Sequence, residues 1–310
     1  MTEPETASAR GFRAWWRRHP TAITFAGSLI VAAALVYALA DDRGAFTEAL
    51  TAAPLWILAV AVVLHIGWLA ARSEAWSVCV TAAGGRVDRR RLYRASSLGY
   101  LGNLFNGTLG LAVRTAALRR SAPDDCPHAG VLLTAEIPIV VVEVALAALM
   151  SFTLVGPLGL PWWTPLVAFA VAGVMLAVLQ RVARNRRNGL WAGLAVLRGM
   201  EGRSKIVALV VLAVVIQIAR NWFLLNGIGV EASVLDSIAV LIGLAVAGLL
   251  PIGPSGAAAT VAVLLGAGGL AAATAAGAML TATAAAGALC FAAWALVDKL
   301  RAARTPSPAF

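Results

Sequence analysis

The chain has few charged residues and few of the side chains that perform chemistry. Only 13% of its 310 residues are Asp, Glu, Lys or Arg, and it has three cysteines and three histidines. These cysteines and histidines have no spacing typical of metal ligands or of a disulfide framework. The sequence also has no glycine-rich nucleotide loop and no nucleophile triad. We therefore expect a protein that is not an enzyme, needs no metal or cofactor, and does not bind nucleic acid.

Long apolar runs dominate the chain instead. Hydrophobic residues make up 60% of it and its mean hydropathy is +0.83, more than a soluble core of this size requires. A helix of about 20 apolar residues spans the hydrocarbon of a bilayer and satisfies its own backbone. The sequence thus predicts an all-α polytopic integral membrane protein. Six runs are long enough to be transmembrane helices: 21–40, 55–83, 129–155, 162–180, 206–228 and 271–297.

Two further segments, 95–118 and 234–270, are apolar but interrupted by glycine or proline. Basic loops stay in the cytoplasm, which restricts how these segments cross. With a cytoplasmic N-terminus, most of the 25 basic residues lie in cytoplasmic loops only if 95–118 enters from that side and returns. The segment 234–270 then leaves and returns on the outer side. Two broken or re-entrant elements, one from each side and one in each half, are the pattern expected of an inverted repeat around a midplane site.

The same charge distribution sets the predicted domain organisation. Residues 1–20 form a basic cytoplasmic N-terminus, 21–297 form a single transmembrane domain, and 298–310 form a cytoplasmic tail. The first run ends in ALADD, which is similar to a signal-peptidase site, but the run is long for a signal peptide and we expect an uncleaved span. The protein should therefore be a multi-pass protein of the bacterial plasma membrane, with both termini cytoplasmic.

Three arginines fall within the apolar runs, and an arginine at the centre of a bilayer costs about 2.5–3.5 kcal/mol on insertion scales. They could form ion pairs that fix helix register, or at least one could face a cavity and bind an anionic group such as phosphate. Glutamates seven residues apart, as in the run 136–143, lie on nearly one helical face and are natural partners. The arginines are Arg72, Arg114 and Arg220, the candidate charge partners are Glu136, Glu143 and Glu74, and Asn103 and Asn106 are polar neighbours of Arg114.

The stretch GLLPIGPSGAAA, residues 248–259, interrupts the second broken segment. Proline lacks an N–H donor and glycine adopts conformations closed to other residues, so this turn exposes backbone groups that lipid cannot satisfy. We expect the turn to line a cavity, and the alternative is a tight loop between two ordinary helices. The residues concerned are Pro251, Gly253, Pro254, Ser255 and Gly256.

These segments resemble a bacterial flippase-like family, typified by the membrane region of lysylphosphatidylglycerol synthase, the multiple peptide resistance factor. The resemblance covers about residues 55–297 and is carried by RSEAW, GNLFNGTLGLAVR, AEIP and LPIGPSG. Asn103, Gly110 and Arg114 match the family pattern in the second of these, although its usual proline is missing and Leu111 stands where an acidic or small polar residue is common. In the last, Ser255 replaces a usual glycine and no glutamate follows.

The resemblance implies a lipid flippase or transporter that moves an anionic phospholipid or a polyprenyl-phosphate-linked lipid between leaflets. It implies that Arg114 binds the phosphate with the help of Arg72 and Arg220, and that Asn103 and Asn106 also contact the head group. The glutamates would pair with these arginines or sense a cationic group. The turn 251–256 would line the opposite entrance. The alternative is a non-transporting membrane subunit that docks a separate lipid-modifying enzyme on its basic cytoplasmic face, and a solute or ion channel is a third possibility.

Overall fold

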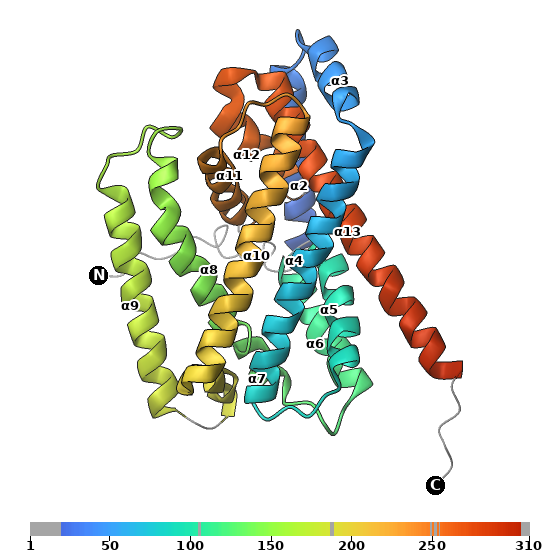
Figure 1. Cartoon of the computed structure of the whole chain (residues 1–310), viewed down its shortest axis with the longest axis vertical. Coiled ribbons are helices and arrows are strands. Elements are labelled where there is room, and N and C mark those ends of the chain that lie inside the picture. Colours follow the sequence, from blue (N-terminus) through green and yellow to red (C-terminus); the bar gives the residue numbers. More distant parts are fainter. Residues whose placement is uncertain are drawn as a thin grey trace, which may run out of the picture.

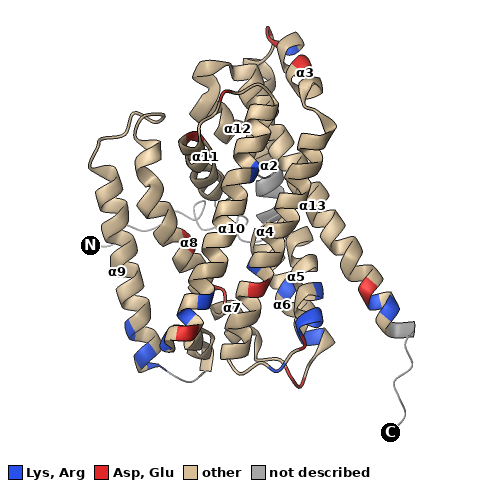
Figure 2. Cartoon of the chain, in the orientation of Figure 1, with Lys and Arg blue, Asp and Glu red and all other residues tan. Residues whose placement is uncertain are grey.

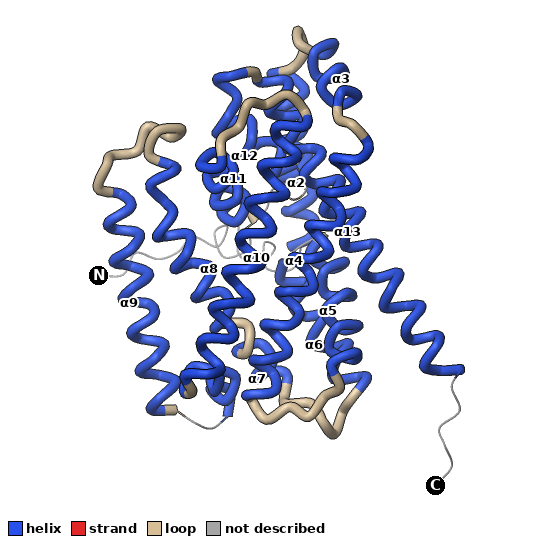
Figure 3. Tube along the Cα trace, in the orientation of Figure 1, coloured by secondary structure: helices blue, strands red, loops and turns tan. Residues whose placement is uncertain are grey.

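The computed structural model describes residues 20–104, 107–186, 189–248, 250, 253 and 255–304. Over these residues every regular element is helical and none is a strand (Figure 3). The α-helices are α2 (Pro20–Ala38), α3 (Arg43–Ala52), α4 (Leu55–Ala82), α5 (Arg89–Asn103), α6 (Gly107–Ser121), α7 (Ala129–Thr134), α8 (Ile137–Met150), α9 (Thr164–Asn185), α10 (Met200–Gly227), α11 (Val234–Ala247), α12 (Ser255–Leu265) and α13 (Leu270–Arg304), and the short 3₁₀ helices are η1 (Ser151–Leu154), η2 (Gly189–Arg198) and η3 (Gly266–Gly268).

Five of the six predicted transmembrane runs are confirmed as helices long and apolar enough to cross a membrane. The run 21–40 lies in α2, which is described as an apolar helix over Ala26–Ala38, so a sixth span stays a prediction. The predicted tail begins within α13, because this helix continues to Arg304. The five candidate spans are Leu55–Ala82, Ala129–Leu154, Thr164–Asn185, Met200–Gly227 and Leu270–Ala302.

The outer surface of the bundle is apolar, as lipid contact requires. Helix α9 shows this most clearly, because Ala172 and Ala183 are its only fully buried side chains among those described. Its large side chains point outward, and Phe169 and Val174 are 59% and 65% exposed. Such a face would be costly in water but is expected of a helix that borders hydrocarbon.

The two interrupted segments form two hairpins of short helices. The first hairpin is α5–α6, with 15 residues in each helix, and the second is α11–α12, with 14 and 11 residues. A 15-residue helix is about 22 Å long, less than the thickness of the hydrocarbon core. Figure 1 places α5–α6 at the lower end of the bundle and α11–α12 at the upper end.

Each hairpin follows a long helix and precedes another in the same order along the chain. In the first half the order is α4, α5–α6 and the broken span α7–α8, and in the second half it is α10, α11–α12 and α13. Helices α4 and α10 both have 28 residues and run side by side in opposite directions (Figure 1).

Basic residues gather at one end of this bundle. Figure 2 shows Lys and Arg concentrated at the lower end, where α5, α6 and the start of α10 lie, and few at the upper end near α3. The charge asymmetry read from the sequence is therefore an asymmetry of the folded protein.

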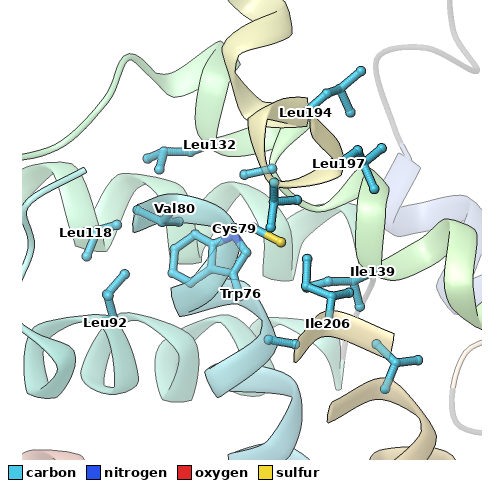
Figure 4. Close-up of a cluster of buried hydrophobic side chains, with 14 of the residues drawn as sticks. Trp76, Cys79, Val80, Leu92, Leu118, Leu132, Ile139, Leu194, Leu197 and Ile206 are labelled. Atoms are coloured by element: carbon cyan, nitrogen blue, oxygen red, sulfur yellow. The ribbon is translucent and has the colours of Figure 1, made fainter. Parts of the chain in front are cut away.

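A buried cluster near the basic end joins the first half to α10. Trp76 lies at its centre, with Cys79 of the same helix and Ile139 of α8 beside it (Figure 4), and all three have no exposed surface. Leu194 of η2 closes the cluster from the lower end. This packing holds α4, α8 and η2 together directly beside the charged residues described below.

The hairpin α5–α6 depends on glycine at its crossing point. A Cβ atom on Gly102 would lie 2.8 Å from the Cα of Gly110, and one on Gly99 would lie 3.0 Å from the carbonyl oxygen of Gly110. Contacts this close between backbones are the usual way in which small residues bring membrane helices together. The hairpin thus cannot accept side chains at these positions without moving apart.

We predict that Gly102→Val destabilises the protein by about 1–3 kcal/mol, the usual cost of overpacking. The midpoint of thermal unfolding in detergent would fall. The matched control is Gly173→Val in α9, where an added Cβ meets nothing within 4 Å, and this variant should unfold close to the parent. Equal midpoints for Gly102→Val and Gly173→Val would contradict the close packing of the hairpin.

Candidate functional site

Four charged side chains meet inside the bundle and form one ion-pair cluster. Arg72 of α4 donates from Nη2 to Oε1 of Glu136 at 3.0 Å, and its Nη1 donates to Glu143 of α8. Arg114 of α6 donates to the second carboxylate oxygen of Glu136. Glu136 is therefore shared by two arginines, and it connects the α5–α6 hairpin to α4 and α8.

The local structure places Glu136 at a helix break. Helix α7 ends at Thr134 and α8 begins at Ile137, with Glu136 at the N-cap position and Pro138 in the first turn. Proline suits a first turn because its missing N–H would have no partner in the helix there. The positive end of the α8 dipole also favours a carboxylate at this position. The break therefore places a buried carboxylate beside the arginines.

Tryptophan rings support both arginines of the cluster. The guanidinium carbon of Arg114 lies 4.2 Å from the centre of the Trp76 ring, and that of Arg72 lies 5.7 Å from the centre of the Trp68 ring. A cation over an aromatic face gains about 0.5–2 kcal/mol, more when it is removed from water. Both rings come from α4, where Trp68 lies four residues before Arg72 and Trp76 four residues after it, so each is one helical turn from Arg72.

The cluster is buried and electrically balanced. The side chains of Arg114 and Glu136 are 6% and 13% exposed, and those of Arg72 and Glu143 are 18% and 28% exposed. Two positive and two negative charges leave no net charge, so each arginine has the carboxylate that its position in an apolar bundle demands. The nitrogen Nε of Arg114 is buried and donates to no atom of the described residues. The Nε–H of Arg114 is therefore a donor that a ligand could use.

Tyr100 of α5 extends the polar contacts toward the hairpin. Its hydroxyl donates to the carbonyl oxygen of Leu69 at 3.3 Å and lies 3.3 Å from the hydroxyl of Ser73, both in α4. Sequence reasoning missed Tyr100, Trp68 and Trp76. The spacing of four residues between each tryptophan and Arg72 is the sequence signal that could have indicated the aromatic contacts. The contact of Trp76 with Arg114 has no such signal, because it joins residues far apart in the chain.

Arg220 of α10 does not join the cluster, contrary to the expectation that it assists Arg114 and Arg72 at one site. It is 3% exposed. Its Nη2 donates to the carbonyl oxygen of Leu280 and, at 2.7 Å, to the hydroxyl of Thr283, both in α13. Its surroundings are those of a separate polar site.

Two other predicted site residues, Glu74 and Asn103, make contacts within or to the α5–α6 hairpin. Glu74 forms an ion pair with Arg89 at 2.8 Å and accepts a hydrogen bond from Tyr93 at 2.9 Å, so it ties α4 to the start of α5. Asn103 is exposed at the end of α5, and an added Cβ on Gly110, one turn before Arg114, would clash with Oδ1 of Asn103. Asn106 lies outside the described residues.

The predicted turn is described only in part, because Pro251 and Pro254 lie outside the described residues. Gly253 has a φ of +54°, in the left-handed region that favours glycine. The hydroxyl of Ser255 donates to the carbonyl oxygen of Ser28 in α2 at 3.1 Å, and Gly256 is buried in the first turn of α12. Ser255 therefore links the second hairpin to α2.

We predict that Glu136→Gln destabilises the protein by about 3–5 kcal/mol, because it leaves a buried guanidinium without its carboxylate. The matched control is Glu74→Gln, which removes a carboxylate whose partner Arg89 is 67% exposed, and such pairs contribute about 0–1 kcal/mol. Thermal unfolding in detergent measures both. A loss for Glu136→Gln no greater than that for Glu74→Gln would contradict the central position of Glu136.

Comparison with known proteins identifies the family to which the chain belongs. A search of curated proteins and a search of solved structures gave no match. The family described as "Lysylphosphatidylglycerol synthase TM region" matches residues 24–293. The matched region contains both short-helix hairpins and all four residues of the cluster. The chain belongs to the family of lysylphosphatidylglycerol synthase transmembrane regions.

Proposed function

We propose that this membrane protein moves an anionic lipid, a phospholipid or a polyprenyl-phosphate-linked lipid, from one leaflet to the other. The observation that carries the proposal is the buried cluster of Arg72, Arg114, Glu136 and Glu143, which lies between the α5–α6 hairpin, the long helix α4 and the broken span α7–α8. A lipid phosphate is an oxyanion like the carboxylate of Glu136, and it would replace this carboxylate as the acceptor on Arg114.

The donor geometry of Arg114 supports this exchange. Its Nη2 is bonded to Glu136, whereas its buried Nε donates to nothing in the described part of the chain. A guanidinium binds phosphate best through two parallel N–H donors. A phosphate at Arg114 would use both nitrogens, and one carboxylate oxygen uses only one. Arg72 keeps Glu143 as a partner, so only Glu136 needs to move.

The arrangement of the helices supports transport across the membrane. We propose that α5–α6 and α11–α12 are re-entrant hairpins, because their helices are too short to span and lie at opposite ends of the bundle (Figure 1). The two halves, each a long helix followed by a hairpin and another long span, would then form an inverted repeat. Repeats of this kind hold a substrate near the midplane and open to the two sides in turn.

The charge distribution supports an orientation in the bacterial plasma membrane. Lys and Arg gather at the end where α5–α6 lies (Figure 2), and basic segments stay on the cytoplasmic side. We propose that α5–α6 opens to the cytoplasm, that α11–α12 faces outward, and that both termini are cytoplasmic. Arg114 would then receive the head group from the inner leaflet.

We also propose that this chain does not modify the lipid. Its family is named after a synthase, but the matched region is the transmembrane region. The cluster has no nucleophile poised beside a base, and its charged groups are all engaged with one another. Binding and movement of a phosphate account for them.

The test is translocation of fluorescent phosphatidylglycerol in liposomes that contain the purified protein, read from the accessibility of the head group. Arg114→Ala should slow the movement at least about tenfold, because a charge-assisted contact to phosphate is lost. Arg89→Ala is the matched control, since Arg89 is exposed and pairs only with Glu74 among acidic residues of the described chain, and it should move lipid like the parent.

Equal rates for Arg114→Ala and the parent would remove Arg114 from the transport site. A parent that moves neither phosphatidylglycerol nor a polyprenyl-phosphate lipid would contradict transport itself. That result would favour the alternative in which the basic cytoplasmic face docks a separate lipid-modifying enzyme.

A further inference from the structure

Arg220 is a buried cation without a counter-charge. It is 3% exposed, and it forms no ion pair within 4.0 Å among the described residues. Its two acceptors, the carbonyl oxygen of Leu280 and the hydroxyl of Thr283, are both neutral. Neutral acceptors satisfy donors but leave the charge itself uncompensated, which is costly in an apolar bundle.

Further polar groups beside Arg220 also lack partners. The Nε of Arg220 is buried and donates to no described atom. Asn221, the next residue of α10, is 1% exposed, and neither its amide nitrogen nor its amide oxygen has a partner in the described part of the chain. His65 of α4, which is 6% exposed, lies within electrostatic reach of Arg220. Buried groups of this kind are normally satisfied, and several together without partners indicate a site that a ligand completes.

The contrast with the Arg72–Arg114 cluster identifies the kind of ligand. In that cluster each guanidinium faces a carboxylate and the charges cancel. At Arg220 one positive charge remains without an anion among the described residues. A guanidinium with a free N–H donor is suited to an oxyanion.

The site lies deeper along the same helix as the cluster. His65 and Arg72 are seven residues apart in α4, which corresponds to about 10 Å along the helix axis. Arg220 is therefore about two helical turns from Arg72, away from the basic end of the bundle. A phosphate that leaves the cluster toward the other leaflet would meet Arg220 next.

We infer that Arg220 forms a second oxyanion site, which takes the lipid phosphate after it leaves Arg114. This inference rests on the proposed lipid transport and adds an intermediate position to it. Thr283 and the carbonyl oxygen of Leu280 hold the guanidinium in place on α13, and Nε, which has no partner among the described residues, receives the phosphate.

The experiment combines unfolding and transport for Arg220→Gln, Arg220→Lys and Thr283→Val. Removal of an uncompensated charge should leave the thermal midpoint of Arg220→Gln equal to or above that of the parent, while translocation of fluorescent phosphatidylglycerol falls about tenfold or more. Arg220→Lys keeps the charge but not the fork and should retain intermediate transport. Thr283→Val removes one of the two acceptors that hold the guanidinium, so its transport should fall by less than that of Arg220→Gln. Arg89→Ala remains the control that should transport like the parent.

Binding distinguishes a lipid head group from a free anion. Arg114→Ala leaves the second site as the remaining one, so short-chain phosphatidylglycerol should still raise the unfolding midpoint of this variant. In the double variant that combines Arg114→Ala with Arg220→Gln, short-chain phosphatidylglycerol should leave the unfolding midpoint unchanged. Stabilisation by inorganic phosphate, with none by short-chain phosphatidylglycerol, would show a free-anion site and overturn the assignment to the lipid.

Two other results would overturn the inference. If Arg220→Gln, Arg220→Lys and Thr283→Val all lower the midpoint and transport in parallel, Arg220 only braces α13 against α10. If Arg220→Gln folds and transports like the parent, the site is not on the path. Failure of the proposed function looks different, because then the parent itself moves no lipid.

Discussion

The shared carboxylate of Glu136 is the contact on which the rest of the structure depends. One of its oxygens accepts from Arg72 and the other from Arg114, so three separate chain segments are joined through one side chain. The glycine packing holds α5 and α6 against each other, and the contact of Arg114 with Glu136 joins this hairpin to α4 and α8. A phosphate that takes Arg114 from Glu136 would loosen the hairpin at the same moment, which couples head-group binding to movement.

The two arginine sites differ in how their charge is compensated, and under the proposed transport they would accept a phosphate in different ways. The first site is neutral and closed by its own carboxylates, so a phosphate would have to displace one of them. The second, at Arg220, has only neutral acceptors among the described residues, so a phosphate would supply the missing negative charge. Neither step would require a covalent reaction.

Much of this could be predicted from the sequence, because hydrophobic length and charge are local properties. The long runs identified five spans, and the interrupted runs 95–118 and 234–270 correspond to the two hairpins. The seven-residue spacing of Glu136 and Glu143 predicted two carboxylates on nearly one helical face as partners for the arginines, and both form ion pairs with Arg72. The grouping of Arg220 with Arg72 and Arg114 could not be predicted, because it depends on which helices pack together. Arg220 donates to α13 and not to the cluster.

The aromatic support of the cluster was also beyond the sequence. In the sequence, Trp76 looks like any other apolar residue of α4. Its contact with Arg114 exists because the tertiary structure brings α6 close enough to place the guanidinium over the ring. Likewise, the ion pair of Glu74 with Arg89 follows from the turn that brings α5 back against α4. The sequence therefore indicates which side chains could form a site, and only the tertiary structure shows which of them meet.

The central claim is that lipid phosphate replaces Glu136 on Arg114. An experimental structure of the protein in nanodiscs that contain phosphatidylglycerol tests it most directly. The account predicts a phosphate within hydrogen-bond distance of the Nε and Nη2 atoms of Arg114, with the Glu136 carboxylate moved away. A structure in which phosphates lie only at the bilayer surface, while Arg114 remains paired with Glu136, would contradict it.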